Sequence, residues 1–339
     1  MTKRITIREV ALDAGVSITA VSKALNGKSD NISAETIKRI EESAKKLKYI
    51  PNSIASSMIT KRTNTIGIIV PNITNSFFVQ VIKEIEETFR KHKYSLFISD
   101  SGDKFENDIY LINNFVNKNV DFLIYVPSRE ANLLENNKYV NELLHNLPIK
   151  YIIFDRELLH NENKFIPIDD IKGGYLATNY LLQNGHRRIL VIAGPISSTS
   201  SNNRLEGYKK ALKDNNIPFN EDLVVYGNYS SHKVRELIDV IFRKDFTGVF
   251  ALSDTMGYTF IKESYLRGKL VPNDYSIIGY DDLDFSYLAI LPLSSISRDK
   301  SKIANELVNI VISKIDEKDY IPIPIEPSLT IRDSIRKIK

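Results

Sequence analysis

Residues 6–25 constrain the fold of this chain most strongly, because they predict two short helices joined by a tight turn. Thr6 and Glu9 have the spacing of a capping box, in which side chains satisfy the free backbone amides at the start of a helix. Gly15 can adopt the left-handed conformation that ends this helix, and Ser17 is placed to cap the next one. The arrangement predicts a helix-turn-helix.

The second helix of this motif has an apolar inner face and a polar outer edge. Val21, Ala24 and Leu25 fall on the inner face at helical spacing. The outer edge can read DNA if Ile18 meets a thymine methyl group and Thr19 donates its hydroxyl to a base edge. Two capped helices with a glycine turn also occur in all-helical domains that bind no DNA. The candidate DNA contacts of the motif are Thr6, Ser17, Ile18, Thr19, Ser22, Lys23 and Asn26.

Positive charge is concentrated in the segment that holds the motif. Residues 1–62 contain twelve basic and six acidic side chains, a net charge of +6, whereas the rest of the chain has 34 basic and 36 acidic side chains. A surface that binds DNA phosphates needs such a concentration of positive charge. Each lysine taken singly also fits a solvated position on a helix. We therefore interpret residues 1–62 as a DNA-binding head.

Short apolar segments alternate with amphipathic helical segments after residue 64. The first series predicts strands at 65–70, 95–99 and 122–126, with helices at 77–91 and 107–117 between them. A second series begins near residue 174. Such alternation is typical of parallel, doubly wound sheets. The expected fold is an all-α helix-turn-helix head followed by an α/β core of two doubly wound parallel-sheet lobes.

The composition favours a cytoplasmic regulator over a secreted protein or an enzyme. The chain has no cysteine, no N-terminal apolar run typical of a signal peptide, and no stretch near the roughly 20 apolar residues of a membrane span. Its five histidines form no i, i+4 pair, and it has no nucleophile elbow or phosphate-binding glycine loop. We expect no catalysis, no metal and no cofactor, and keep a carbohydrate-active enzyme as a distant alternative.

Distinct motifs occur in both the head and the core. The head contains IREVA at 7–11, AGVS at 14–17, VSKALNG at 21–27 and YIPN at 49–52. The core contains TNTIGIIVPN at 63–72, GGYLA at 173–177, GHRRI at 185–189 and IIGYDD at 277–282. Together these motifs resemble the LacI/GalR family of bacterial transcriptional regulators over nearly the whole chain.

The resemblance implies three functional parts. A helix-turn-helix domain would span 1–48, a hinge helix with its linker 49–62, and an effector-binding and dimerisation core 63–339. The core would resemble type I periplasmic binding proteins, with an N-lobe at about 63–160 and 295–325 and a C-lobe at about 161–292 and 326–339. The chain would cross between the lobes near 155–169, 291–297 and 324–328.

The resemblance also implies that the hinge helix enters the minor groove and inserts an apolar side chain between base pairs. Met58 stands where the family usually has leucine, which keeps the apolar length and adds flexibility. A two-turn helix is marginal alone in water, so we expect it to form with DNA and a symmetry mate. The alternative is that Met58 packs against the core. The candidate DNA contacts of this segment are Tyr49, Asn52, Ala55 and Met58.

Polar side chains follow several predicted strands, at the sheet edge where open α/β folds bind ligands. Asp155, Ser253, Asp254 and Asp281 lie in such positions. Carboxylates accept hydrogen bonds from a ligand with many hydroxyl groups. Asp155 and Asp281 have the alternative of capping loops.

Other candidates come from the opposite side of the expected cleft. Arg204 offers a forked donor, or forms only an interlobe salt bridge. Family correspondence places Ser198 and Ser200 at the pocket. It also places aromatic rings there that can stack on a sugar, although the phenylalanines equally suit the core; these are Phe77, Phe78 and Tyr229. Ser253 departs from the asparagine common in sugar-responsive members.

These observations predict a sequence-specific repressor of carbohydrate-utilisation genes. A sugar or sugar derivative in the interlobe cleft would control its affinity for a pseudo-palindromic operator, which it would bind as a homodimer. Control by a phosphocarrier protein or by a nucleobase is the alternative. We expect the protein in the cytoplasm at the nucleoid, with no membrane partner.

Overall fold

A computed structural model describes residues 5–25, 32–50, 57, 61–161 and 168–338. The chain forms two compact units, Met1–Thr63 and Asn64–Lys339. Each unit has its own hydrophobic core.

The first unit contains α1 (Ile7–Ala14), α2 (Ile18–Leu25) and α3 (Ala34–Lys46). The Glu9 carboxylate accepts hydrogen bonds from the backbone N–H of Thr6 at 2.6 Å and from its hydroxyl at 3.0 Å. Gly15 ends α1 with φ +64°, and the Ser17 hydroxyl accepts from the Ala20 amide at 3.1 Å. These contacts are the capping interactions and the turn that the sequence predicts. The core of this unit consists of Val10, Ala11, Ala14, Val21, Ala24 and Ile40.

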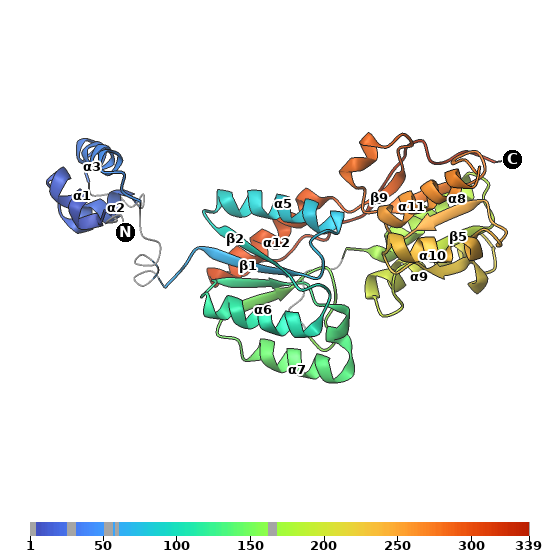
Figure 1. Cartoon of the computed structure of the whole chain (residues 1–339), viewed down its shortest axis with the longest axis horizontal. Coiled ribbons are helices and arrows are strands. Elements are labelled where there is room, and N and C mark those ends of the chain that lie inside the picture. The colour runs from blue at the N-terminus through green and yellow to red at the C-terminus, as the bar shows by residue number, and fades with distance from the viewer. Residues whose placement is uncertain (1–4, 26–31, 51–56, 58–60, 162–167, 339) are drawn as a thin grey trace. The chain divides into compact units, whose positions relative to one another are not determined.

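The second unit begins with a lobe built on a four-stranded parallel sheet of order β2-β1-β3-β4, which we call the N-lobe. In Figure 1, α5 and α12 lie on one face of this sheet and α6 and α7 on the other. Its elements are β1 (Thr65–Val70), α5 (Ser76–Lys91), β2 (Ser95–Asp100), α6 (Phe105–Asn117), β3 (Phe122–Tyr125), the 3-10 helix Arg129–Asn132, α7 (Leu134–His145), β4 (Lys150–Ile153) and, from later in the chain, α12 (Lys300–Ile315).

The C-lobe carries a six-stranded sheet of order β10-β9-β8-β7-β5-β6, in which only the β9–β10 pair is antiparallel. Helices α8 and α9 pack against each other, as do α10 and α11. Its elements are α8 (Asp170–Gln183), β5 (Ile189–Ala193), α9 (Thr199–Asp214), the 3-10 helix Glu221–Leu223, β6 (Val224–Tyr226), α10 (Ser231–Ile241), β7 (Gly248–Ala251), α11 (Asp254–Leu266), β8 (Ser276–Tyr280), the 3-10 helix Asp284–Leu288, β9 (Ser294–Ser297) and β10 (Ser328–Thr330).

The predicted fold class is confirmed, with corrections to individual elements. The α-helices and strands that the sequence did not predict are α7, α12, β6, β9 and β10. Helix α7 buries Asn137 beside Val140 and Leu144, which weakens its apolar pattern, and the two strands β6 and β10 have only three residues each.

One lobe boundary also needs correction. Strand β9 pairs with β8 in the C-lobe sheet, so residues 295–297 belong to the C-lobe and not to the N-lobe as expected. The second crossing between the lobes therefore follows Ser297, where the chain leaves β9 and enters α12.

No helix within the described part of the chain is long and apolar enough to cross a membrane.

Candidate functional site

A cavity of about 660 Å³ lies between the two lobes of the second unit. Its lining residues follow β1, β2, β3 and β4 on the N-lobe side and β5, β6, β7, β8 and β9 on the C-lobe side. The carboxyl ends of parallel strands meet at one edge of each sheet, so the two edges face each other across the cavity. Its volume falls in the ordinary range for small-molecule sites, roughly 300–1,000 Å³.

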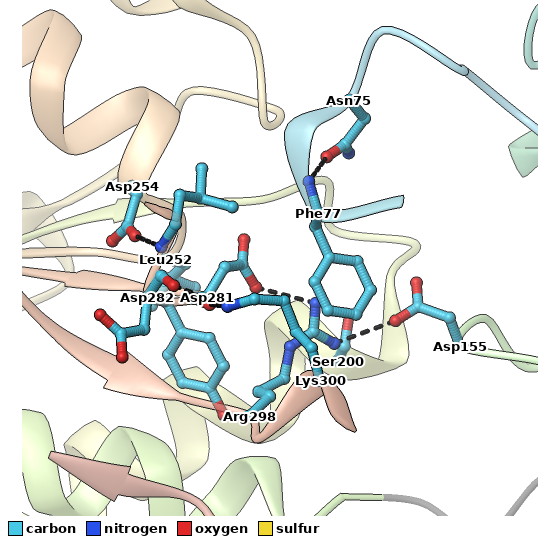
Figure 2. A network of polar contacts seen from close by, with 12 residues as sticks. Asn75, Phe77, Asp155, Ser200, Leu252, Asp254, Asp281, Asp282, Arg298 and Lys300 are labelled. Atoms are coloured by element: carbon cyan, nitrogen blue, oxygen red, sulfur yellow. Dashed lines mark hydrogen bonds and ion pairs between the residues drawn. The ribbon is translucent and has the colours of Figure 1, made fainter. Parts of the chain in front are cut away.

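Arg298 links the two lobes across this cavity. One guanidinium nitrogen lies 2.9 Å from Asp155 Oδ1, in the loop after β4 of the N-lobe, and another lies 2.8 Å from Asp281 Oδ1, after β8 of the C-lobe. The guanidinium carbon also sits 3.5 Å from the centre of the Phe77 ring (Figure 2). Burial opposes the charge of Arg298, but Asp281 and Asp155 outweigh it and raise the pKa of the guanidinium.

Arg204 forms a second buried cationic site, and this one lies within the C-lobe. Its Nε donates to Asp170 Oδ1 at 2.9 Å, and NH1 donates to the Leu252 carbonyl at 2.8 Å. The guanidinium carbon lies 3.7 Å from the centre of the Tyr280 ring, and the Tyr280 hydroxyl donates to the same Asp170 oxygen at 2.6 Å. The salt bridge therefore joins α9 to α8 and is not the interlobe bridge that the sequence left open.

A third ionic cluster lies on the N-lobe side of the cavity. Asp103 accepts ion pairs from Arg129 Nε at 2.7 Å and from Arg156 NH1 at 2.6 Å. Arg156 also donates to the Pro127 carbonyl at 3.0 Å. Two arginines thus share one carboxylate at the cavity wall.

Nine of the ten predicted effector-binding residues line the cavity: Phe77, Phe78, Asp155, Ser198, Ser200, Arg204, Tyr229, Ser253 and Asp281. Several also have structural roles. The Ser198 hydroxyl caps α9 by accepting from the Ser201 amide, and the Ser253 hydroxyl caps α11 by accepting from the Met256 amide, both at 3.3 Å.

Asp254 is the exception, since it is absent from the described residues that line the cavity. It is fully buried behind them, where one oxygen accepts from the Ser295 hydroxyl at 2.6 Å and the other from the Leu283 amide at 2.8 Å. Burial, aided by the negative charge of Asp281, raises the pKa of Asp254 to about 8. As the first residue of α11, Asp254 points its side chain into the lobe, so the prediction that it binds the effector is wrong in this structure.

The aromatic candidates are less available than the sequence implies. Phe77 and Phe78 are almost fully buried, and the Arg298 guanidinium covers one face of the Phe77 ring. Tyr229 is partly buried, has a positive φ of +56°, and packs against Gly194, where an added Cβ would overlap its ring. These side chains close the cavity more than they offer open stacking faces.

The sequence reading missed Arg298, Asp103, Arg129 and Arg156 at the cavity. The last three follow β2, β3 and β4, so the rule that selected Asp155 and Asp281 would have selected them too. Arg298 follows β9, a strand that the sequence reading did not include.

The DNA-binding candidates of the head lie mostly on one exposed edge. Ser17, Ile18, Thr19 and Lys23 are exposed along α2, whereas Val21 and Ala24 are buried on its opposite face. Ile18 keeps 43% of its surface exposed, so its side chain is accessible to a partner. Thr6 is exposed at the start of α1, and Tyr49 packs on the core of the head. Asn26, Asn52, Ala55 and Met58 lie outside the described residues.

A helix-turn-helix head and a two-lobed ligand-binding core together define a class of DNA-binding regulator. Residues 6–52 match the family described as bacterial regulatory proteins, lacI family, and residues 178–335 match a periplasmic binding protein-like domain.

Several relatives match the chain over nearly its full length, among them two repressors. The HTH-type transcriptional repressor PurR of Actinobacillus pleuropneumoniae serotype 3 (strain JL03) is 31% identical over 339 residues, 98% of this chain and 99% of that protein. PurR of Histophilus somni (strain 129Pt) is 30% identical over 337 residues, with the same coverage. The chain therefore belongs to the LacI family of bacterial regulatory proteins, and it is a DNA-binding transcriptional repressor and not an enzyme.

Solved structures share this fold. The lac repressor dimer bound to operator and the anti-inducer ONPF has a TM-score of 0.80 at 24% identity and covers 98% of this chain and 100% of its own. A LacI family transcriptional regulator from Enterococcus faecium with bound ribose has a TM-score of 0.71 at 26% identity, covering 81% and 100%. The transcriptional regulator CelR in complex with cellobiose has a TM-score of 0.69 at 26% identity, covering 98% and 100%.

Proposed function

We propose that this repressor controls genes of carbohydrate use and that an uncharged sugar or sugar derivative binds in the interlobe cavity. The observation that carries the proposal is the lining of that cavity. It combines hydroxyl and amide side chains with arginines that are already paired; the hydroxyl and amide side chains are those of Asn72, Thr74, Asn75, Ser76, Ser128, Asn132, Ser197, Ser198, Thr199, Ser200, Asn228, Ser230, Ser231, Ser253 and Thr255.

The pairing of the arginines is the main argument against a phosphorylated ligand. Arg129 and Arg156 share Asp103, Arg204 pairs with Asp170, and Arg298 pairs with both Asp155 and Asp281, so four arginines face four carboxylates in total; these are the arginines among the described residues of the lining. A phosphate group needs cations whose charge is not already neutralised. Neutral hydroxyls need only donors and acceptors, which this lining supplies.

Two structural neighbours support the sugar class. The regulator from Enterococcus faecium carries ribose and CelR carries cellobiose, both on the same fold as this chain. The cavity volume of about 660 Å³ leaves room for more than a single sugar ring.

The head and the hinge act on DNA, and the core controls them. Residues 1–48 serve as the helix-turn-helix domain, in which Ile18, Thr19 and Lys23 read the major groove. Residues 49–62 serve as a hinge that folds on the minor groove and wedges Met58 between base pairs, and 63–339 form the effector-binding and dimerisation core. The effector changes operator affinity by its unequal affinity for two arrangements of the lobes, and this coupling is reciprocal.

A homodimer fits the exposed edge of the N-lobe. Strand β2 lies at the end of the sheet, and Phe97 and Ile98 on it are 43% and 41% exposed. An apolar edge strand of this kind favours a protein partner. A two-fold dimer also presents two heads to a pseudo-palindromic operator.

A thermal-shift screen tests the ligand class. Uncharged sugars, sugar phosphates and nucleobases are added to the full-length protein, since a ligand at 100 times its Kd stabilises the native state by about 2.7 kcal/mol. We expect uncharged sugars to raise the melting temperature of the unsubstituted protein, and we expect Asp281→Ala to lose that shift. Stabilisation only by sugar phosphates would contradict the proposal.

A nucleobase is the second candidate, and the carboxylate groups in the lining favour it. Tyr229 and Phe78 border the cavity, and the outer oxygens of Asp155 and Asp281 can accept from the N–H edge of a base. Stabilisation by nucleobases alone would select this candidate. No response to any of the three groups would contradict an effector from these small-molecule classes.

A further inference from the structure

Arg298 lies where the chain passes from the C-lobe to the N-lobe. It directly follows β9, which pairs within the C-lobe sheet, and precedes α12, which packs on α5 in the N-lobe. This position lets one side chain reach groups of both lobes.

The contacts of Arg298 are divided between the lobes. On the N-lobe side it pairs with Asp155 at 2.9 Å and stacks on the Phe77 ring at 3.5 Å from the ring centre. On the C-lobe side it pairs with Asp281 at 2.8 Å. Figure 2 shows the guanidinium between the two carboxylates and beside the ring.

Burial strengthens the Coulomb attraction within these ion pairs and makes the loss of one partner costly. The Arg298 side chain is 6% exposed, and those of Asp155 and Asp281 are 18% and 10% exposed. Water screens charges little in such a place, and removing one member of a buried pair leaves an uncompensated charge. Both aspartates also have left-handed backbones, with φ +60° and +103°, so their loops are held in a conformation that few side chains tolerate.

We propose that Arg298 is a positioning residue of the cleft, which holds the two lobes at a set spacing before any ligand binds. The residue does so through Asp155 on one lobe and Asp281 on the other. A sugar then binds beside a bridge that the protein has already made, and Asp155 and Asp281 use their outer oxygens for it. The proposal concerns the lobes of the ligand-free protein, so it stands whether or not the sugar proposal is correct.

Interlobe distances in the full-length, ligand-free protein test this directly. The chain has no cysteine, so a pair introduced at exposed Glu106 on α6 and Lys213 on α9 can be spin-labelled uniquely. Labelled chains are mixed with excess unlabelled chains, so that the measured distances come from within one chain. The variants Arg298→Met, Arg298→Lys and Asp155→Asn are compared with the unsubstituted background.

We expect Arg298→Met and Asp155→Asn to broaden the distance distribution and move it to a different mean. Arg298→Lys should restore part of the original distribution, because a lysine reaches one carboxylate but not both. A double variant that combines Arg298→Met with Asp155→Asn should resemble the stronger of these two single variants, since both changes break the same bridge.

Arg267→Met is the matched control. Arg267 also joins two carboxylates, Asp239 at 2.9 Å and Glu263 at 2.7 Å, but all three residues belong to the C-lobe. Its distribution should superimpose on that of the unsubstituted protein. Identical distributions for Arg298→Met, Asp155→Asn and the background would overturn the proposal, and so would an equal change in Arg267→Met. If Arg298→Met fails to fold, Asp155→Asn alone decides.

Discussion

Burial changes the proton affinity of individual carboxylates around the cleft. Asp254 is fully buried, and its pKa rises from 3.8 to about 8. Burial also raises the pKa of Asp281, but the adjacent Arg298 acts in the opposite direction. A carboxyl group with a pKa near 8 is mostly neutral at pH 7, so Asp254 serves as a hydrogen-bonding group that joins α11 to the loop at Leu283 and to β9.

The raised pKa of Asp254 predicts a pH-dependent contribution to stability. Below about pH 4 the group is protonated in both states; between about pH 4 and 8 the unfolded chain releases the proton while the native protein keeps it. Raising the pH in that window therefore favours unfolding, by at most about 1.4 kcal/mol per pH unit from this group. Asp254→Asn mimics the neutral acid and removes this dependence.

Urea unfolding of both proteins between pH 5 and 9 provides the measurement. The free energy of unfolding of the unsubstituted protein minus that of Asp254→Asn should fall with pH and level off above about pH 8. Asp245→Asn, at an exposed aspartate after α10, is the control for the effect of an aspartate-to-asparagine change itself. If the difference in unfolding free energy between the unsubstituted protein and Asp254→Asn does not change with pH, the pKa of the Asp254 carboxyl is not raised by folding.

The close packing of helix α8 on helix α9 determines the position of Arg204. Gly174 and Gly207 allow this approach, because an added Cβ at Gly174 would overlap the Arg204 carbonyl and one at Gly207 would overlap the Ile171 carbonyl. The same contact brings Arg204 against Asp170, the first residue of α8.

Gly207→Ala should therefore destabilise the protein by about 1–3 kcal/mol, the usual effect of overpacking. Alanine is the better helix former by about 1 kcal/mol, so a loss of stability isolates the packing effect. The free energy of urea unfolding measures it, with Lys213→Ala on the exposed face of the same helix as the control. A more stable Gly207→Ala protein would mean that α8 and α9 lie farther apart than described.

The side chains on the exposed edge of α2 are expected to determine which operator sequence the head prefers. Ile18→Ala and Thr19→Ala should each cost about 1–3 kcal/mol per lost base contact and change the preferred sequence. Selection from a randomised operator pool measures this preference. Glu42→Gln, on the exposed surface of α3, should alter overall affinity without changing the ranking of sites. An unchanged ranking for both α2 variants would remove α2 from base readout.

For the whole molecule, a dimer is needed to present two heads to one operator. Its N-lobe contact is expected along β2. Phe97→Glu places a charge on that apolar edge, so sedimentation at micromolar concentration should show a shift from dimer to monomer and weaker operator binding. Tyr110→Glu on α6, where the tyrosine is 67% exposed, is the control and should leave the dimer intact. A stable monomer before any substitution would contradict the dimer itself.

Local signals in the sequence determined most of the head and the element order of the core. Thr6, Glu9, Gly15 and Ser17 act on backbone groups within a few residues of themselves, so their spacing is enough to predict α1, the turn and α2. Periodicity predicted the alternating strands and helices for the same reason. The position of Asp155 and Asp281 at strand ends followed from the general geometry of parallel sheets.

The use of the charged groups in the cleft depends on contacts between distant segments of the folded chain. Asp155 lies far from Asp281 and Arg298 along the chain, and the pairing of the three depends on the spacing of two lobes and the path of the crossing after β9. Asp254 adjoins Ser253 in sequence, yet the rotation of α11 turns one side chain to the cavity and the other into the core. Sequence spacing sets neighbours along an element, whereas burial and ion pairing depend on elements that only the folded chain brings together.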